Sequence, residues 1–275
     1  MTVWQIYGFI IVEFLFEYSV FAVLFLHKLN RRNFFVLRAA LSFVALFSIG
    51  IPVAFFYQAF GGTLWGRILV YLLLFSLFTL LTKLCFRENF LTLLFCCSMA
   101  YAAQNFAYKV YLIIWTSGEQ LRLYDHWGGY FNLYYRLMYY AIFAVSVLAS
   151  WFLFVRRITG KMENRKLNYK MLLITFVILG ITIFLCSVED LFFADLSVMR
   201  ENRFENYGYF VLRQTGNAFS VVCCFIVLLL ASKAIVENEL LQEVEYLKYA
   251  IRQSERQYQI SKDSIELINV KCHDI

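Results

Sequence analysis

Residues Tyr209–Ile275 read YFVLRQTGNAFSVVCCFIVLLLA–SKAIVENELLQEVEYLKYAIRQSERQYQISKDSIELINVKCHDI, where the dash separates Ala231 from Ser232. Most residues before the dash are apolar, and the second half of the run, from Val221 to Ala231, is apolar throughout. At about 1.5 Å per helical residue, this run can cross a hydrocarbon layer of about 30 Å. After the dash the chain is polar, highly charged and free of Gly and Pro. The change predicts two domains, a membrane part at residues 1–231 and a long polar helix at residues 232–275.

Similar apolar runs recur throughout residues 1–231. The whole chain is 61% hydrophobic and only 16% charged, whereas about a quarter of the residues in a soluble domain are charged. Runs of this length predict an all-α, multi-pass membrane helix bundle with about seven spans. We place the spans at Trp4–Leu26, Phe34–Tyr57, Arg67–Thr82, Phe90–Trp115, Asn132–Val155, Met171–Val188 and Tyr209–Ala231.

The connections between the spans alternate in charge. Eleven basic residues fall in the first, third and fifth connections, and four fall in the others. Because Lys and Arg accumulate on the cytoplasmic side of membrane proteins, this asymmetry predicts an outer N-terminus and a cytoplasmic C-terminus in a cell membrane. The eleven are Lys28, Arg31, Arg32, Lys83, Arg87, Arg156, Arg157, Lys161, Arg165, Lys166 and Lys170, and the four are Arg67, Arg122, Arg200 and Arg203.

The polar tail has the spacing of a coiled coil. Apolar or small residues alternate at intervals of four and three, between mostly charged and polar neighbours. They are Leu240, Val244, Leu247, Ile251, Ser254, Tyr258, Ser261, Ile265, Ile268 and Cys272. This spacing favours a parallel homodimer through residues 240–272. The alternative is an ordinary amphipathic helix that packs on the chain's own loops.

The tail reaches a His-Asp pair, His273 and Asp274, one residue beyond the last heptad position. A neutral imidazole nitrogen can attack a phosphoryl group, and a neighbouring carboxylate can accept a proton or offset the positive charge that develops. An exposed His-Asp pair without such a role is the simpler alternative.

The stretch IELINVKCHD at residues 265–274 resembles the phosphoacceptor box of GHKL-type sensor histidine kinases. It is most similar to the branch with multi-pass membrane sensors that includes peptide-pheromone receptor kinases. The resemblance implies that His273 is the autophosphorylated residue and Asp274 its acid/base partner. It also implies a response regulator, an ATP-binding kinase domain and a small peptide ligand as partners.

The family continues beyond the His-Asp pair with an ATP-binding domain, whereas this sequence contains no Asn-rich ATP lid or Gly-rich nucleotide loop after His273. We therefore expect no cofactor in this chain, and its own enzymatic activity stays open. Our interpretation is the membrane input module of a two-component kinase, truncated at the phosphoacceptor box. There are two alternatives. A transporter or channel would be distinguished by substrate flux, and a kinase-less membrane adaptor would be insensitive to the loss of His273.

Ionisable residues within the spans indicate a ligand site, because charges at membrane depth are costly. Lys109, Arg136 and Arg213 share a depth roughly 10 Å outward of mid-span, and Glu13 would be their counter-ion. The alternative is that these cations extend to the outer interface and pair there with glutamates. The spacing of Cys and His residues predicts no metal site, and contact with anionic lipid explains the net charge of +6 without nucleic acid.

Overall fold

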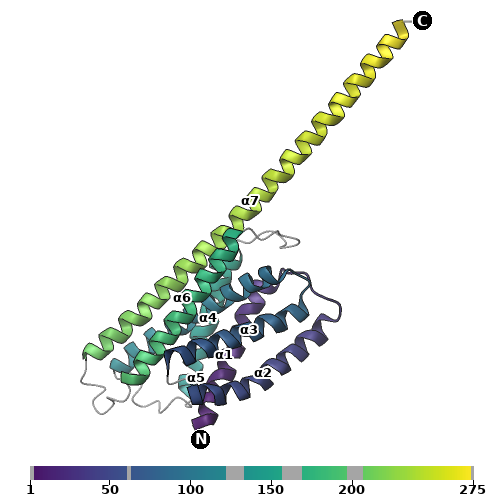
Figure 1. Cartoon of the computed structure of the whole chain (residues 1–275). Helices are drawn as coiled ribbons and strands as arrows, with labels where there is room; N and C mark the ends of the chain where they lie inside the picture. The colour runs from purple at the N-terminus through teal and green to yellow at the C-terminus, as the bar shows by residue number, and fades with distance from the viewer. Residues whose placement is uncertain (1–2, 61–62, 122–132, 157–168, 197–206, 274–275) are drawn as a thin grey trace. The chain divides into compact units, whose positions relative to one another are not determined.

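The computed structural model describes residues 3–60, 63–121, 133–156, 169–196 and 207–273. Within these ranges the elements are helices, joined at one point by an isolated β-bridge, which confirms the all-α prediction. The elements are α1 (Val3–Leu26), α2 (Phe35–Phe60), α3 (Leu64–Cys85), α4 (Phe90–Gln120), α5 (Leu133–Ser150), the π-helix η1 (Trp151–Val155), α6 (Tyr169–Leu196) and α7 (Tyr207–His273) (Figure 1).

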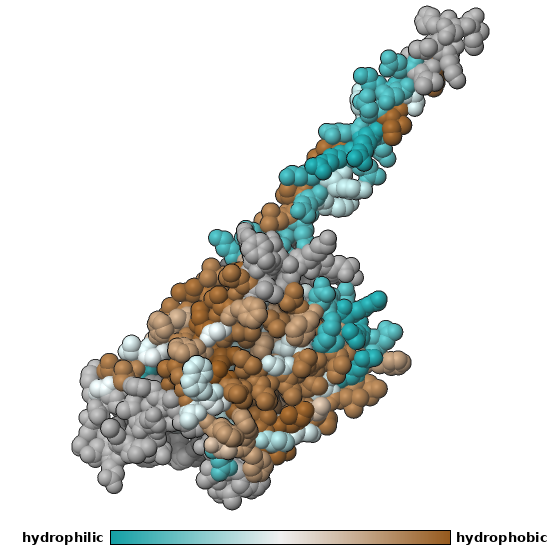
Figure 2. Space-filling view, in the orientation of Figure 1, coloured by the Kyte–Doolittle hydropathy of each residue, from teal (hydrophilic) through white to brown (hydrophobic). Residues whose placement is uncertain are grey.

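Six helical segments of the described chain are long and apolar enough to cross a membrane. They belong to α1, α2, α3, α4, α5 with η1, and α7, whereas the apolar segment within α6, Leu173–Leu185, is shorter. Several helices that could span a membrane are therefore confirmed by length and composition, while the count of seven stays a prediction. The face of the bundle drawn in Figure 2 is largely apolar where it is coloured, as is expected of helices that face lipid.

The chain divides into two compact units, Met1–Ser232 and Lys233–Ile275. The sequence placed this boundary one residue earlier, between Ala231 and Ser232. The first unit holds the bundle, including the apolar part of α7. The second unit consists, in its described part, of the remainder of α7.

Helix α4 is the central helix of the first unit and its most buried candidate span. It packs against α1, α3, α5 and α6, and it also accepts hydrogen bonds from Gln214 of α7. Small and polar residues such as Ser98, Ala102 and Gln104 are buried along α4. Small residues let neighbouring backbones approach closely, which is how membrane helices pack without a hydrophobic driving force.

An aromatic cluster joins α1, α3 and α4. The ring of Tyr18 is fully buried, and its centroid lies 4.1 Å from that of Phe78 on α3 and 5.8 Å from that of Tyr101 on α4. The Tyr18 hydroxyl donates a hydrogen bond to the carbonyl oxygen of Cys97, 3.0 Å away. The cluster thus combines ring packing with a satisfied polar group.

Contacts between helices fix the direction of each neighbour. Along α1, Glu13 and Phe21 meet successively later residues of α5, so α1 and α5 run the same way. Along α7, Gln214 and Phe225 meet successively earlier residues of α4, so these two helices run in opposite directions. The contacts are Glu13–Arg136, Phe21–Phe143, Gln214–Thr116 and Phe225–Phe106.

Hydrogen bonds between the α1–α2 and α3–α4 connections place the C-terminal end of α3 beside that of α1. Arg32 N donates to Cys85 O, and Arg87 N donates to Asn30 O, both at 3.0 Å. Phe14 of α1 contacts Tyr101 of α4, and Tyr18, one turn later, bonds Cys97, so α1 and α4 are antiparallel. It follows that α1, α3, α5 and the bundle part of α7 all end at one end of the first unit.

We predict that Tyr18→Phe lowers the free energy of unfolding of the bundle by about 0.5–1.5 kcal/mol, because it removes a buried hydrogen bond and keeps the ring. Denaturation in detergent micelles measures this change. Tyr246→Phe is the matched control, since Tyr246 is 72% exposed on the second unit. Equal stability of the Tyr18→Phe variant and the parent would contradict the role of this bond.

Candidate functional site

The tail part of α7 carries an exposed apolar face. Leu240, Leu247 and Ile251 are each more than half exposed, at 56%, 58% and 57%. They belong to the heptad positions that the sequence predicts to pair with a second helix. The structure describes a single chain, so the coiled coil itself stays a prediction.

The predicted phosphoacceptor lies at the end of this helix. His273 is the last residue of α7, while Asp274 lies outside the described residues, as does the side chain of His273. The helix therefore carries the heptad spacing without interruption to His273.

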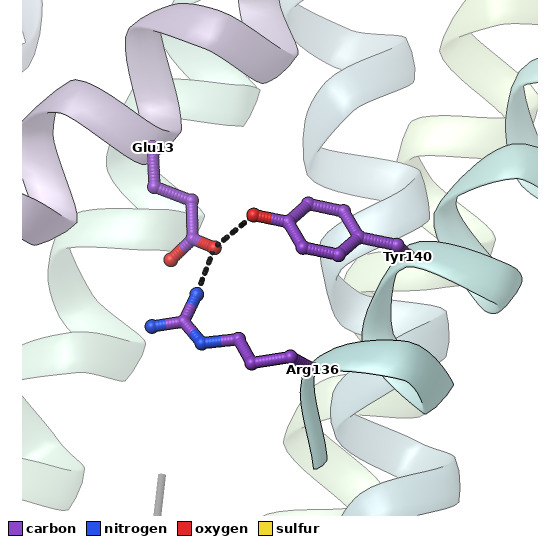
Figure 3. Close-up of polar contacts among 3 residues, drawn as sticks. All are labelled: Glu13, Arg136 and Tyr140. Atoms are coloured by element: carbon purple, nitrogen blue, oxygen red, sulfur yellow. Dashed lines mark hydrogen bonds and ion pairs between the residues drawn. The ribbon is translucent and has the colours of Figure 1, made fainter. Parts of the chain in front are cut away.

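Within the bundle, Glu13 and Arg136 are brought together, as expected from the sequence. Arg136 Nη1 of α5 lies 2.5 Å from Glu13 Oε1 of α1, and the two side chains are only 15% and 10% exposed (Figure 3). A carboxylate and a guanidinium removed from water attract one another strongly, and each offsets the desolvation of the other. This ion pair therefore joins α1 to α5.

Two aromatic residues lie beside the pair. The Tyr140 hydroxyl donates to the same oxygen, Glu13 Oε1, at 3.4 Å (Figure 3). The Arg136 guanidinium carbon lies 4.4 Å from the centroid of the Phe9 ring, an arrangement that favours a cation. Arg136 and Tyr140 stand at i and i+4, on one face of α5, which is a sequence signal that the prediction did not use.

Glu17, one turn beyond Glu13, faces a different helix. Its Oε2 accepts a hydrogen bond of 2.8 Å from Gln104 Nε2 of α4, and both side chains are buried. The spacing of i and i+4 puts Glu13 and Glu17 on one face of α1, and in the structure the two residues contact different helices. The acidic residues of α1 thus contact both α4 and α5.

The other two predicted ligand-binding cations lie on α4 and α7. Lys109 is only 1% exposed, and its Nζ lies 5.6 Å from the centroid of the Tyr108 ring. Arg213 is half-buried. Lys109 shares the α4 face of Phe106 and Ile113 by helical spacing, and both of these residues contact α7.

Two amide side chains of α7 face the bundle interior near this level. Gln214 Nε2 donates to Thr116 Oγ1 and Ser117 Oγ, both at 2.7 Å, and to Ile113 O at 3.1 Å. Asn217, one turn later, is fully buried, and neither of its amide atoms has a hydrogen-bond partner. An unsatisfied buried amide is costly, so this turn of α7 would gain stability from a polar partner.

Among the described residues, no group of three or more His, Cys, Asp or Glu side chains is placed to hold a metal ion. Comparisons with known proteins give no match, whether to a family model, to a curated protein or to a solved structure. The function of the chain is therefore inferred from its residues and their geometry.

We predict that Glu13→Gln and Arg136→Gln each destabilise the bundle by about 1.5–3 kcal/mol, because each leaves a partner charge without its ion pair. The double variant should be less destabilised than the sum of the two single variants. A double-mutant cycle measured by denaturation in micelles gives the coupling energy. Additive effects would show that the pair contributes no coupling.

Proposed function

We propose that this chain is the membrane input module of a two-component sensor histidine kinase. One observation carries the proposal: α7 runs as a single helix from the membrane bundle, through a heptad-spaced tail, to His273. In such a module the bundle senses an extracellular or intramembrane signal, and the tail presents a phosphoacceptor histidine. An ATP-binding kinase domain and a response regulator act as partners.

The charge at one end of the bundle supports a cytoplasmic tail. The helices α1, α3, α5 and the bundle part of α7 end at the same end of the first unit, as their contacts require. Arg31, Arg32, Arg87 and Arg156 lie in or beside the connections at this end. Basic connections are retained on the cytoplasmic side, so the end from which the tail continues is the cytoplasmic one in this proposal.

The identity of the heptad residues supports a parallel dimer. In the part of the tail nearest the bundle, Val244 and Ile251 occupy one seam position, and Leu240 and Leu247 occupy the other. Further along, the first position holds Tyr258, Ile265 and Cys272, and the second holds Ser254, Ser261 and Ile268. β-Branched residues at the first position with Leu at the second favour two parallel strands.

The charges that flank the seam agree with this register. In a parallel dimer with both helices in register, Glu243 of one helix stands opposite Lys248 of the other, and the same attractive pair repeats on the other side. Ser254 and Ser261 weaken the middle of the seam, which lowers the cost of a sliding or rotating transition there.

The chemistry assigned to the tail is phosphoryl transfer to His273. A nitrogen of the neutral imidazole forms a bond to the γ-phosphorus of ATP, the bond from that phosphorus to the bridging oxygen breaks, and ADP leaves. Asp274 accepts the ring proton, or stabilises the charge on the ring. The phosphoryl group then passes to a carboxylate of the response regulator, as the resemblance implies.

The signal would act on the polar groups of the bundle. The cations Lys109, Arg136 and Arg213 suit a small peptide that carries anionic or carbonyl groups. Glu13 is their internal counter-ion when no ligand is bound. Binding can change the tail only if the ligand prefers one packing of the helices over another. Competition of the ligand with Glu13 for Arg136 would provide such a preference, because it would loosen the contact between α1 and α5.

The test is phosphorylation of the full chain in membrane vesicles, with γ-labelled ATP and an added ATP-binding domain of this kinase class. We expect a label that is stable in alkali and lost in acid, as a phosphoramidate is, and that is absent from His273→Gln. His27→Gln is the matched control, because His27 is exposed and lies outside the tail.

Two results would overturn the proposal. The first is an unlabelled parent chain in the presence of an ATP-binding domain that phosphorylates other histidine substrates. The second is a label that persists in His273→Gln. If the chain is not phosphorylated but vesicles that contain it show substrate flux, the transporter alternative is favoured. If signalling in cells is unchanged by His273→Gln, the adaptor alternative is favoured.

A further inference from the structure

The two connections at the basic end of the bundle are joined to each other. Residues 27–38 and 83–90 together contain six Lys and Arg residues and one acidic residue, Glu88. Arg31 and Phe86 form an antiparallel β-bridge, and Asn30 N donates to the Glu88 carboxylate at 3.3 Å. Glu88 is buried, so the acidic and basic side chains that these two connections leave exposed are cationic, apart from the imidazole of His27.

Three arginines, Arg31, Arg38 and Arg87, are exposed here, and we call them the arginine patch. Arg38 is held in place by carbonyl oxygens, since Nε donates to Asn33 O at 3.1 Å and Nη1 to Leu84 O at 3.3 Å. The Arg31 guanidinium carbon lies 4.9 Å from the centroid of the Phe35 ring. Within the described chain, no carboxylate pairs with any of the three arginines.

An exposed apolar surface begins next to the arginine patch. Leu37 and Leu41 of α2 are 61% and 63% exposed, and Leu80 and Leu84 of α3 are 59% and 50% exposed. The contact from Arg38 to Leu84 sets these parts of α2 and α3 side by side. Figure 2 shows a hydrophilic patch beside the apolar surface, where Figure 1 shows the ends of α2 and α3.

Phe34, which lies between Arg31 and Leu37 in the sequence, adds a strained and exposed residue. Its φ angle is 57°, a left-handed conformation that bulky residues rarely adopt, and its side chain is 80% exposed. Strain of this kind persists where the surroundings hold it, and it often marks a functional position. An aromatic ring at the boundary between cationic and apolar surfaces is typical of the membrane interface.

We propose that this face is a binding site for an anionic phospholipid. The lipid phosphate occupies the arginine patch, where guanidinium groups can bind two oxygens at once. The acyl chains lie along the exposed leucines of α2 and α3. A lipid matches both surfaces with one molecule, whereas a free phosphate matches the arginines alone. The bound lipid would fasten the α1–α2 connection to the α3–α4 connection from outside.

The experiment uses the full chain in nanodiscs of phosphatidylcholine with about one-fifth phosphatidylglycerol. Mass spectrometry of the lipids retained by the purified protein measures the enrichment of phosphatidylglycerol over the bulk composition. We expect enrichment for the parent, and a loss of about fivefold in relative affinity for each arginine removed in Arg31→Gln/Arg87→Gln. Added glycerol phosphate should not displace the lipid.

Arg252→Gln/Arg256→Gln is the matched control, because it removes the same charge from exposed positions of the tail and should keep the enrichment. Arg31→Lys/Arg87→Lys keeps the charge but cannot bind in a bidentate manner, so its enrichment should be intermediate. Equal enrichment in the parent and in Arg31→Gln/Arg87→Gln would overturn the site, as would equal loss in the tail control. If the double Gln variant does not fold, the single variant Arg87→Gln is tested in its place. Enrichment of phosphatidylglycerol equal to that of the parent would again overturn the site.

Discussion

Several polar groups buried along α4 find partners on neighbouring helices, and these contacts constrain the arrangement of the bundle. In a hydrocarbon layer no water is present to satisfy such groups. Gln104 finds the carboxylate of Glu17, the carbonyl of Cys97 accepts the hydroxyl of Tyr18, and Thr116 meets the amide of Gln214. These contacts come from α1 and α7, so α4 determines where both helices lie. A second polar contact, from Glu13 to Arg136, then ties α5 to α1.

The same constraint links the bundle to the proposed function. Gln214 and Asn217 stand on the helix that later becomes the tail. A change in how α7 satisfies these two amides would alter the position of α7 against α4, and α7 continues into the tail as one helix. The buried amide of Asn217 has no hydrogen-bond partner, so a packing that gave it one would gain stability at this point of α7. In our proposal a signal within the bundle reaches His273 by this route.

Much of the fold could be predicted from the sequence, because apolar run length reports membrane-spanning helices directly. Leu64–Cys85 was predicted too short, since Arg67 and Lys83 near its ends resemble loop residues, although Arg67 is buried. The pairing of Glu13 with Arg136 could be expected from the scarcity of charges. The contact between Glu17 and Gln104 could not be predicted, because spacing along one helix does not show which neighbouring helix each residue faces. The β-bridge between Arg31 and Phe86 depends on two distant connections and leaves no local signal.

The central claim is that α7 links a membrane bundle to a dimeric tail without a break. Disulfide formation in membranes, scanned over single Cys substitutions in a Cys272→Ser background, tests it most directly. We expect cross-linked dimers for Val244→Cys and Leu247→Cys, and little cross-linking for Tyr246→Cys and Tyr249→Cys, which lie off the seam. Uniform cross-linking along the tail, or none at the seam positions, would contradict the claim.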